Sequence, residues 1–280
     1  MPIIGAHVST AGGISKAIEN AEKIGAKAIQ IFGSSPQQWL TKFPSPAEIN
    51  NFLAAREKSG NLPVFLHAGY LVNLASSKKE NQEKSIKNLA EHYKIAQTLN
   101  AEGLIFHLGS STGTTFETGM KNLAARIKKV LSLVKGPSKL LLENSSGGGN
   151  KLGSTLKELA ALINQLPEAR TGICLDTAHA FEAGMIEYND QKSVKGFFDQ
   201  WDRLIGIDAI KAIHANDSKT PFDSKSDRHE NIGQGYIGKQ GFKNLAGEKR
   251  LKDKIWILEV PGQQDQGPDA ENIRALASYF

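Results

Sequence analysis

The stretch Ile173-Cys174-Leu175-Asp176-Thr177-Ala178-His179 is an apolar run that ends in a carboxylate and is followed by an imidazole. The run predicts a buried β-strand ending at Asp176, and His179 comes about one helical turn later. A polar side chain at the end of a buried strand is costly unless something satisfies it, and a metal ion would. The alternatives are a satisfied structural histidine and an aspartate that caps the next helix.

The same strand pattern recurs along the chain at Ile3 to His7, Ala28 to Phe32, Val64 to His67, Leu104 to His107, Leu140 to Glu143, Ile173 to Asp176, Ala209 to His214 and Ile255 to Glu259. Helical periodicity fills the intervals at Ile14 to Ile24, Ala47 to Lys58, Ser85 to Leu99, Phe116 to Val134, Leu156 to Gln165, Asp190 to Leu204 and Asp269 to Tyr279. Ser45-Pro46 predicts a helix start, and Thr155 with Glu158 predicts a capping box. We therefore expect an α/β fold, with residues 1–280 forming a single (β/α)8 TIM barrel.

Most of the residues able to bind metal lie at the predicted strand ends: His67, His107, Glu143, Asp176, His179, His214, Asp227, His229 and Glu259. The C-terminal ends of parallel barrel strands converge, so these side chains would line one pocket at that face. Five imidazoles and four carboxylates suit more than one metal ion. Of the two other histidines, His92 is predicted to be a partly exposed helix residue, and His7 to be structural or to support a ligand.

Local spacing divides these ligands among ions. Asp176 and His179 could reach neighbouring ions, whereas Asp227 and His229 stand two residues apart in extended backbone and can chelate one. The two oxygens of Glu143 can bridge two ions. A closely spaced metal pair of this kind clamps the attacking and leaving oxygens of a phosphoryl displacement.

Composition sets limits on the setting of the protein. With 280 residues and 40% hydrophobic content, the chain can bury a large core. The single cysteine, Cys174, lies in an apolar run and is predicted to be a buried structural thiol in a reducing, cytoplasmic setting. We see neither a signal peptide nor a membrane span. The net charge of +5 suits a polyanionic partner if it is concentrated at one face, and otherwise reflects scattered surface lysines.

Several segments combine strand-end ligands with short loops: Gly5-Ala6-His7-Val8-Ser9, His67-Ala68-Gly69-Tyr70-Leu71-Val72-Asn73-Leu74, Leu142-Glu143-Asn144, Leu175-Asp176-Thr177-Ala178-His179-Ala180-Phe181, Asn216-Asp217-Ser218-Lys219, Asp227-Arg228-His229-Glu230-Asn231-Ile232-Gly233-Gln234-Gly235 and Ile257-Leu258-Glu259. Together they resemble the motif set of the endonuclease IV family, DNA repair nucleases that act at abasic sites. The resemblance extends from Gly5 to Glu259.

This resemblance implies three zinc ions per chain, some of which Mn²⁺ could replace. One would take His67, His107 and Glu143, a second Glu143, Asp176, His214 and Glu259, and a third His179, Asp227 and His229. The implied reaction is hydrolysis of the phosphodiester 5′ to an abasic site by a metal-bound hydroxide, leaving a 3′-hydroxyl and a 5′-deoxyribose phosphate. Glu143 and Glu259 would be the catalytic carboxylates. The expected partner is double-stranded DNA containing abasic sites, bound by a monomer.

The resemblance also assigns DNA contacts. Ser34 to Trp39, including Gln37, occupies the place of the family's recognition loop, and Tyr70-Leu71 matches residues inserted into the duplex, where apolar wedges compensate unstacking. Lys219 and Arg228 are candidate phosphate contacts. The alternatives are packing of Trp39 on a barrel helix, ordinary loop packing of Tyr70 and solvated loop charges.

Two departures from the family pattern concern loops. This chain has His107-Leu108-Gly109 where His-Pro-Gly is common, which leaves the ligand intact and alters only loop stiffness. Gln37 stands where an arginine often precedes Gln-Trp, so this departure concerns DNA binding and leaves the metal ligands unaffected.

Two other classes of protein compete with the nuclease. A sugar isomerase or epimerase of the xylose isomerase-like barrel class also gathers Glu, Asp and His at strand ends, but it leaves Asp227, His229 and His179 without a task. A non-catalytic binder of damaged DNA would use structural zinc sites, which are usually rich in cysteine, and the predicted cluster contains no cysteine.

Overall fold

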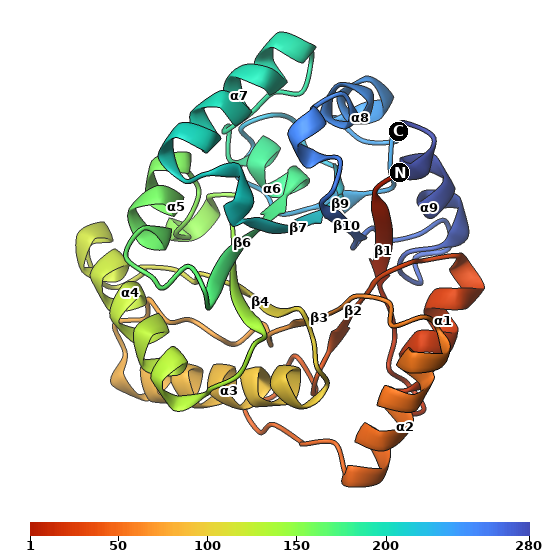
Figure 1. Cartoon of the computed structure of the whole chain (residues 1–280). Helices are drawn as coiled ribbons and strands as arrows, with labels where there is room; N and C mark the ends of the chain where they lie inside the picture. The colour runs from red at the N-terminus through yellow and green to blue at the C-terminus, as the bar shows by residue number, and fades with distance from the viewer.

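Eight parallel strands close into a barrel in the computed structural model, which describes all residues from 1 to 280 (Figure 1). Their order around the barrel is β1-β10-β7-β6-β5-β4-β3-β2. The strands are β1 (Ile3–His7), β2 (Ile29–Phe32), β3 (Val64–His67), β4 (Gly103–His107), β5 (Lys139–Glu143), β6 (Thr171–Asp176), β7 (Ile210–His214) and β10 (Ile255–Leu258). Two short strands outside the barrel, β8 (Asp217–Ser218) and β9 (His229–Glu230), pair antiparallel. The expected TIM barrel is confirmed.

Helices surround the barrel, and the two chain ends lie side by side (Figure 1). The helices are α1 (Lys16–Ile24), α2 (Pro46–Lys58), α3 (Lys79–Thr98), α4 (Phe116–Leu133), α5 (Leu156–Ile163), α6 (Thr177–Glu182), α7 (Gln191–Leu204), α8 (Gly238–Ala246) and α9 (Ala270–Ala277), with 3-10 turns η1 (Gly148–Asn150), η2 (Ile207–Ala209) and η3 (Lys249–Leu251). No helix is both long enough and apolar enough to cross a membrane.

The helix starts follow local capping rules. Ser45 closes a full capping box with Glu48, and Pro46 stands in the first turn, as predicted. The Thr155 hydroxyl accepts the Glu158 N–H, but the Glu158 carboxylate accepts backbone N–H groups upstream of Thr155 rather than that of Thr155 itself. The predicted capping box at Thr155 is therefore only half formed.

Three helices differ from the sequence prediction, and one of them, the short α6, was not among the predicted helices. Helix α3 begins at Lys79 rather than at Ser85, because its first turns are polar and carry no apolar periodicity; an ion pair of 2.6 Å between Lys84 and Glu80 supports them. Helix α8 was not expected, since Gly238 and Gly241 have low helix propensity. Its burial against the barrel outweighs that propensity.

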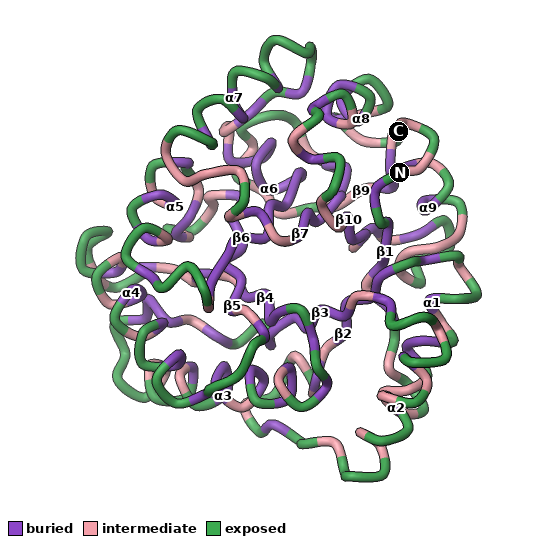
Figure 2. The backbone as a smooth tube through the Cα atoms, in the orientation of Figure 1, coloured by how far each residue is buried: buried purple, intermediate pink, exposed green.

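Burial follows the barrel layers, with the strands buried and the outer turns of the helices exposed (Figure 2). A small cluster of inward-pointing residues fills the barrel: Phe65, Ile105, Leu141, Cys174, Ala212 and Ile257. Each stands two residues before a predicted metal ligand along the same strand direction, so the alternation of side chains places the ligand on the same inner face, one layer higher. The barrel core is thus the floor of the ligand pocket, and Cys174 is a buried free thiol, as predicted.

His92 corrects one sequence prediction. It was expected to be partly exposed, yet it is fully buried in α3 and neither ring nitrogen has a hydrogen-bond partner. Burial lowers the pKa of His92 to about 4. The polar character of histidine suggested exposure, whereas its position in the helix faces the core.

Candidate metal centre

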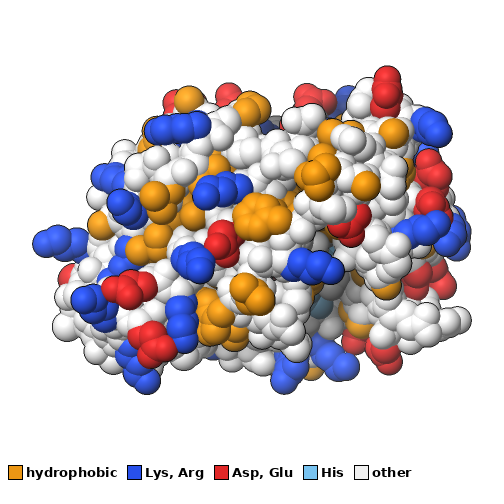
Figure 3. Space-filling model, turned by 90° about the horizontal axis from the view of Figure 1, so that it is seen from below, with side chains coloured by type: hydrophobic (Ala, Val, Ile, Leu, Met, Phe, Trp, Pro, Cys, Tyr) orange, Lys and Arg blue, Asp and Glu red, His pale blue; other side chains and the backbone are white.

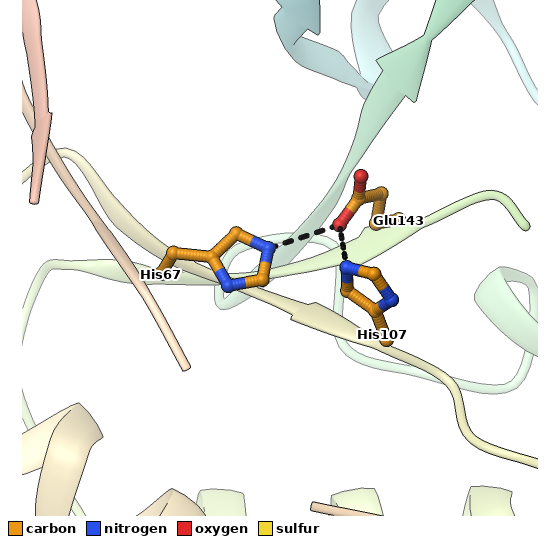
Figure 4. Close-up of side chains that lie close together, drawn as sticks. All are labelled: His67, His107 and Glu143. Atoms are coloured by element: carbon orange, nitrogen blue, oxygen red, sulfur yellow. Dashed lines mark hydrogen bonds and ion pairs between the residues drawn. The ribbon is translucent and has the colours of Figure 1, made fainter. Parts of the chain in front are cut away.

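Glu143 lies at the centre of the converging strand ends. Its Oε2 atom is 3.1 Å from Nε2 of His67 and 3.2 Å from Nε2 of His107 (Figure 4). The register pairs His107 directly with Glu143 on neighbouring strands β4 and β5, and His67 ends β3 beside them. The ligand atoms of these three residues lie within 4.8 Å of one another. They match the first predicted set.

The other oxygen of Glu143 faces a second group. Glu143 Oε1 is 3.0 Å from His214 Nδ1, which is in turn 3.1 Å from Glu259 Oε2. Asp176 Oδ2 is 3.8 Å from the same nitrogen. The ligand atoms of these four residues, which are the predicted second set, also lie within 4.8 Å of one another. Glu143 therefore belongs to two groups through different oxygens.

The third group differs from its predicted composition. Asp176, His179 and His229 have their ligand atoms within 4.8 Å of one another, whereas Asp227 is not a member of that group. Asp227 Oδ1 is 3.1 Å from His179 Nε2 and 3.8 Å from His229 Nε2. Its other oxygen is 3.0 Å from the ammonium of Lys151, which holds that side of the carboxylate away from the imidazoles.

Asp176 serves two purposes. Its Oδ1 accepts the His179 N–H at 2.8 Å and caps α6, and its Oδ2 lies 3.7 Å from His229 Nε2 and 3.8 Å from His214 Nδ1. The helix cap and the metal ligand were alternatives in the sequence, and the two oxygens allow both.

The donor atoms fit metal ions. Nε2 of His229 is buried without a hydrogen-bond partner, and Nε2 of His179 has the Asp227 carboxylate 3.1 Å away, an arrangement that an ion would satisfy. Burial alone would raise the pKa of Glu143, but the imidazoles of His107 and His214 hold that pKa well below its usual value. Glu143 is thus kept ionised at the centre of the pocket. Imidazole nitrogens and carboxylate oxygens without thiolates are ligands suited to zinc and compatible with manganese.

Gln30 is a supporting residue that the sequence analysis missed. It is buried in β2, where its amide N–H donates to Glu259 Oε1 at 2.5 Å and its Nε2 lies 2.9 Å from His7 Nδ1. Its Oε1 accepts from His214 Nε2 at 2.7 Å, which leaves His214 Nδ1 for the second group. A polar residue inside the apolar run Ala28 to Phe32 was the available signal.

Two asparagines hold the residues that carry the carboxylates Asp176 and Glu259. The side-chain amide of Asn144 holds the backbone of Asp176, accepting its N–H at 2.7 Å and donating to its carbonyl at 3.0 Å. Asn216 donates to Asp176 Oδ2 at 2.7 Å and accepts the Glu259 N–H at 2.8 Å. His7, 3.2 Å from Glu259 Oε1, likewise supports a ligand and stands outside the three groups.

A cavity of about 740 Å³ opens above the ligands. His67, His107, His179, Asp227, His229 and Glu259 line it, and the loop residues Ser34, Ser35, Pro36 and Tyr70 form part of its wall. Histidine atoms are visible at the bottom of a recess in the surface (Figure 3). On the side of the barrel seen in Figure 3, basic and acidic side chains are intermixed.

The predicted DNA contacts differ in exposure, and Tyr70 is the one that lines this cavity. The side chain of Tyr70 is 61% exposed and stands edge-on to Phe32 with ring centroids 5.4 Å apart. Leu71 is 38% exposed, and Gln37, Lys219 and Arg228 are exposed. None of these four lines the cavity itself.

Trp39 has the alternative environment considered from the sequence. It is half-buried, its carbonyl accepts from Asn88 of α3 at 3.1 Å, and the Lys84 ammonium lies 6.0 Å from its ring centroid. Trp39 therefore packs beside α3 and does not line the cavity.

Sequence comparison agrees with the barrel and its strand-end ligands. The pattern of the xylose isomerase-like TIM barrels matches residues 18–280. This is the class of protein that the fold and the site define.

Relatives within that class are more specific. The chain is 39% identical over 275 residues to the probable endonuclease 4 of Halothermothrix orenii, covering 98% of each chain. It superposes on the crystal structure of endonuclease IV from Thermus thermophilus with a TM-score of 0.86 and 37% identity, covering 99% of this chain and 98% of that one. The chain belongs to the endonuclease IV family, and it is a nuclease.

A D-tagatose 3-epimerase-like protein has the same fold, with a TM-score of 0.73 over 99% of this chain and 96% of that one. Its identity is only 19%, so the likeness concerns the barrel alone.

Proposed function

We propose that this protein is a DNA repair endonuclease that hydrolyses the phosphodiester 5′ to abasic sites, using three zinc ions held by the nine strand-end and loop ligands. The observation that carries the proposal is that the two oxygens of Glu143 face two different groups of histidines and carboxylates. A bridging carboxylate of this kind suits a pair of neighbouring divalent ions, and phosphodiester hydrolysis is one of the reactions that such pairs catalyse.

Zinc ions bound there would supply Lewis acidity and a hydroxide nucleophile at neutral pH. The protein itself fixes the ligands. Gln30 and His7 hold one oxygen of Glu259, so that the other oxygen points to His214. Asn144 holds the backbone of Asp176, and Asn216 donates to its Oδ2. A pocket whose charged ligands are already oriented needs little rearrangement as negative charge develops on a phosphate.

Selection of damaged DNA would fall to the exposed loops. Tyr70 and Leu71 project beside the cavity, where apolar side chains can fill the gap left by a missing base. Extrusion of an abasic nucleotide is easier than that of a paired one, because less stacking and pairing is lost. Lys219 and Arg228 are exposed on the segments flanking Asp227 and would meet phosphates.

An experiment with two substrates separates this function from that of a sugar isomerase. Protein purified without chelator is incubated with a duplex containing one abasic site, with the undamaged duplex and with ketoses, and its metal content is measured alongside. We expect incision immediately 5′ to the abasic site, no ketose conversion, and loss of incision after chelation. Ketose conversion without incision would overturn the proposal.

A further inference from the structure

A buried carboxylate beneath the third ligand group has no role in the mechanism described above. Glu182 ends α6, one turn beyond His179, and it is fully buried. Its Oε2 has no hydrogen-bond partner, and burial raises the pKa of Glu182 to about 7. A buried glutamate with an unpaired oxygen is costly for the fold, and an apolar residue would avoid that cost.

The partners of Glu182 lie on the segment that carries two of the nine ligands. Its Oε1 accepts from the Ser218 hydroxyl at 2.8 Å and from the backbone N–H of Arg228 at 3.2 Å. The segment from Ser218 to His229, which we call the excursion, joins β8 to β9. Ser218 begins it, and Arg228 stands between Asp227 and His229 near its end. One carboxylate oxygen therefore holds both ends of this excursion.

The excursion depends on such contacts because it lies outside the barrel. Six ligands stand at the ends of barrel strands or directly after them, where the sheet positions them: His67, His107, Glu143, Asp176, His214 and Glu259. Asp227 and His229 come from the excursion, which is held by the pairing of β8 with β9, by the contact of Lys151 with Asp227 and by docking on α6.

Backbone contacts complete this docking. The Lys225 N–H donates to the Glu182 carbonyl at 2.9 Å, and the Asp223 N–H donates to the Phe181 carbonyl at 3.2 Å. Phe222 stands edge-on to Phe181 with ring centroids 5.4 Å apart. These contacts hold the middle of the excursion. The peptide between the two ligands is held from α6 by Glu182.

We infer that Glu182 is a positioning residue for the third metal site, which sets the place of Asp227 and His229 against His179 by accepting the Arg228 N–H and the Ser218 hydroxyl. The inference rests on the proposed function, because it presupposes that the third group binds an ion. A hydrogen-bond acceptor is what this role requires, and a negative charge is not.

The test measures zinc binding by the whole protein in buffers of graded free zinc. Glu182→Leu removes the acceptor, and we expect one of three zinc ions to bind about 10- to 100-fold more weakly while the other two are unchanged. Glu182→Gln keeps the acceptor oxygen and should bind all three ions as the unaltered protein does. His229→Ala identifies the ion, because adding Glu182→Leu to it should cost no further zinc.

Ser218→Ala is a milder variant that keeps the test available if Glu182→Leu does not fold. It removes the 2.8 Å hydrogen bond to Glu182, together with the contacts of the hydroxyl with Thr220, and should weaken the binding of the same ion by about twofold to tenfold. Third-site affinity unchanged in Glu182→Leu, or in Ser218→Ala if the former does not fold, would overturn the inference. Equal weakening in Glu182→Gln would also overturn it. Fewer than three zinc ions in the unaltered protein would instead refute the proposed trinuclear site, which is a separate result.

Discussion

Replacing Gln30 by methionine tests whether the second ligand group depends on support from β2. Methionine keeps the length of the side chain but loses the amide, so His214 Nε2 and Glu259 Oε1 lose contacts of 2.7 Å and 2.5 Å. His214 can then turn or change its tautomer, and Glu259 is no longer held by the amide. The ion bound by Glu143, Asp176, His214 and Glu259 should be the one affected.

The magnitude follows from two separate costs. Loss of a residue that orients metal ligands typically weakens metal binding about 10- to 100-fold, or about 1.4 to 2.7 kcal/mol. In the metal-free protein, a buried imidazole N–H left without an acceptor should lower the free energy of unfolding by about 1 to 3 kcal/mol. Both effects should appear in the same variant.

The assay is zinc competition with chelators of graded strength, followed by elemental analysis and by denaturant unfolding of the metal-free protein. Gln97→Met is the matched control. Gln97 also makes two amide hydrogen bonds, both to the backbone of Ser138, but it lies in α3 away from the ligands. Equal zinc affinity in the two variants would refute the reasoning, because it would mean that Gln30 contributes to the fold alone.

Other perturbations test the remaining parts of the site. Protein purified without chelator should carry close to three divalent ions per chain, mainly zinc, and elemental analysis that finds one or fewer in active protein contradicts the trinuclear site. Glu259→Gln should lower incision at least about a hundredfold while binding to abasic DNA is largely kept, and near-normal incision would remove Glu259 from the mechanism. Gln37→Arg should tighten DNA binding and steepen the slope of log affinity against log salt by about one unit, since arginine neutralises a phosphate and glutamine does not; an unchanged slope in equilibrium titrations places the loop off the DNA backbone. The pKa of Glu182 in the fold, about 7, lies above its ordinary value of 4.5, so its stabilising neutral form is lost as pH rises through 7. Glu182→Gln in metal-free protein should therefore gain stability over the unaltered chain between pH 5 and pH 8, by up to about 3 kcal/mol, and a pH-independent difference in unfolding free energy would contradict this.

The barrel and the convergence of six candidate ligands at its strand ends could be predicted from the sequence because one local pattern recurs in six of the eight strands. An apolar inward residue such as Leu141 is followed two positions later by a ligand such as Glu143, and parallel strands bring those positions to one level. Neither step needs knowledge of distant contacts.

The supporting residues could not be predicted in the same way. Gln30 and Glu182 act on ligands that are far away in sequence, and neither ends a strand as a ligand would. The ion pair between Lys151 and Asp227 likewise joins two loops that are far apart in the sequence. The prediction for His92 was wrong for a different reason: its polar side chain suggested exposure, but the residue is buried in the core.

The two-residue offset between the barrel core and the ligands links strand register to metal uptake. A strand that slipped by one residue during folding would turn its ligand outward and bring a neighbouring side chain into the pocket. Such a misaligned barrel would lack part of its donor set and could not bind the full complement of ions. Because a bound ion stabilises only the state that binds it, metal would select the correctly aligned barrel from among nearly equivalent packings of the same apolar strands. Zinc would then favour the correct strand register during folding before it acts in catalysis.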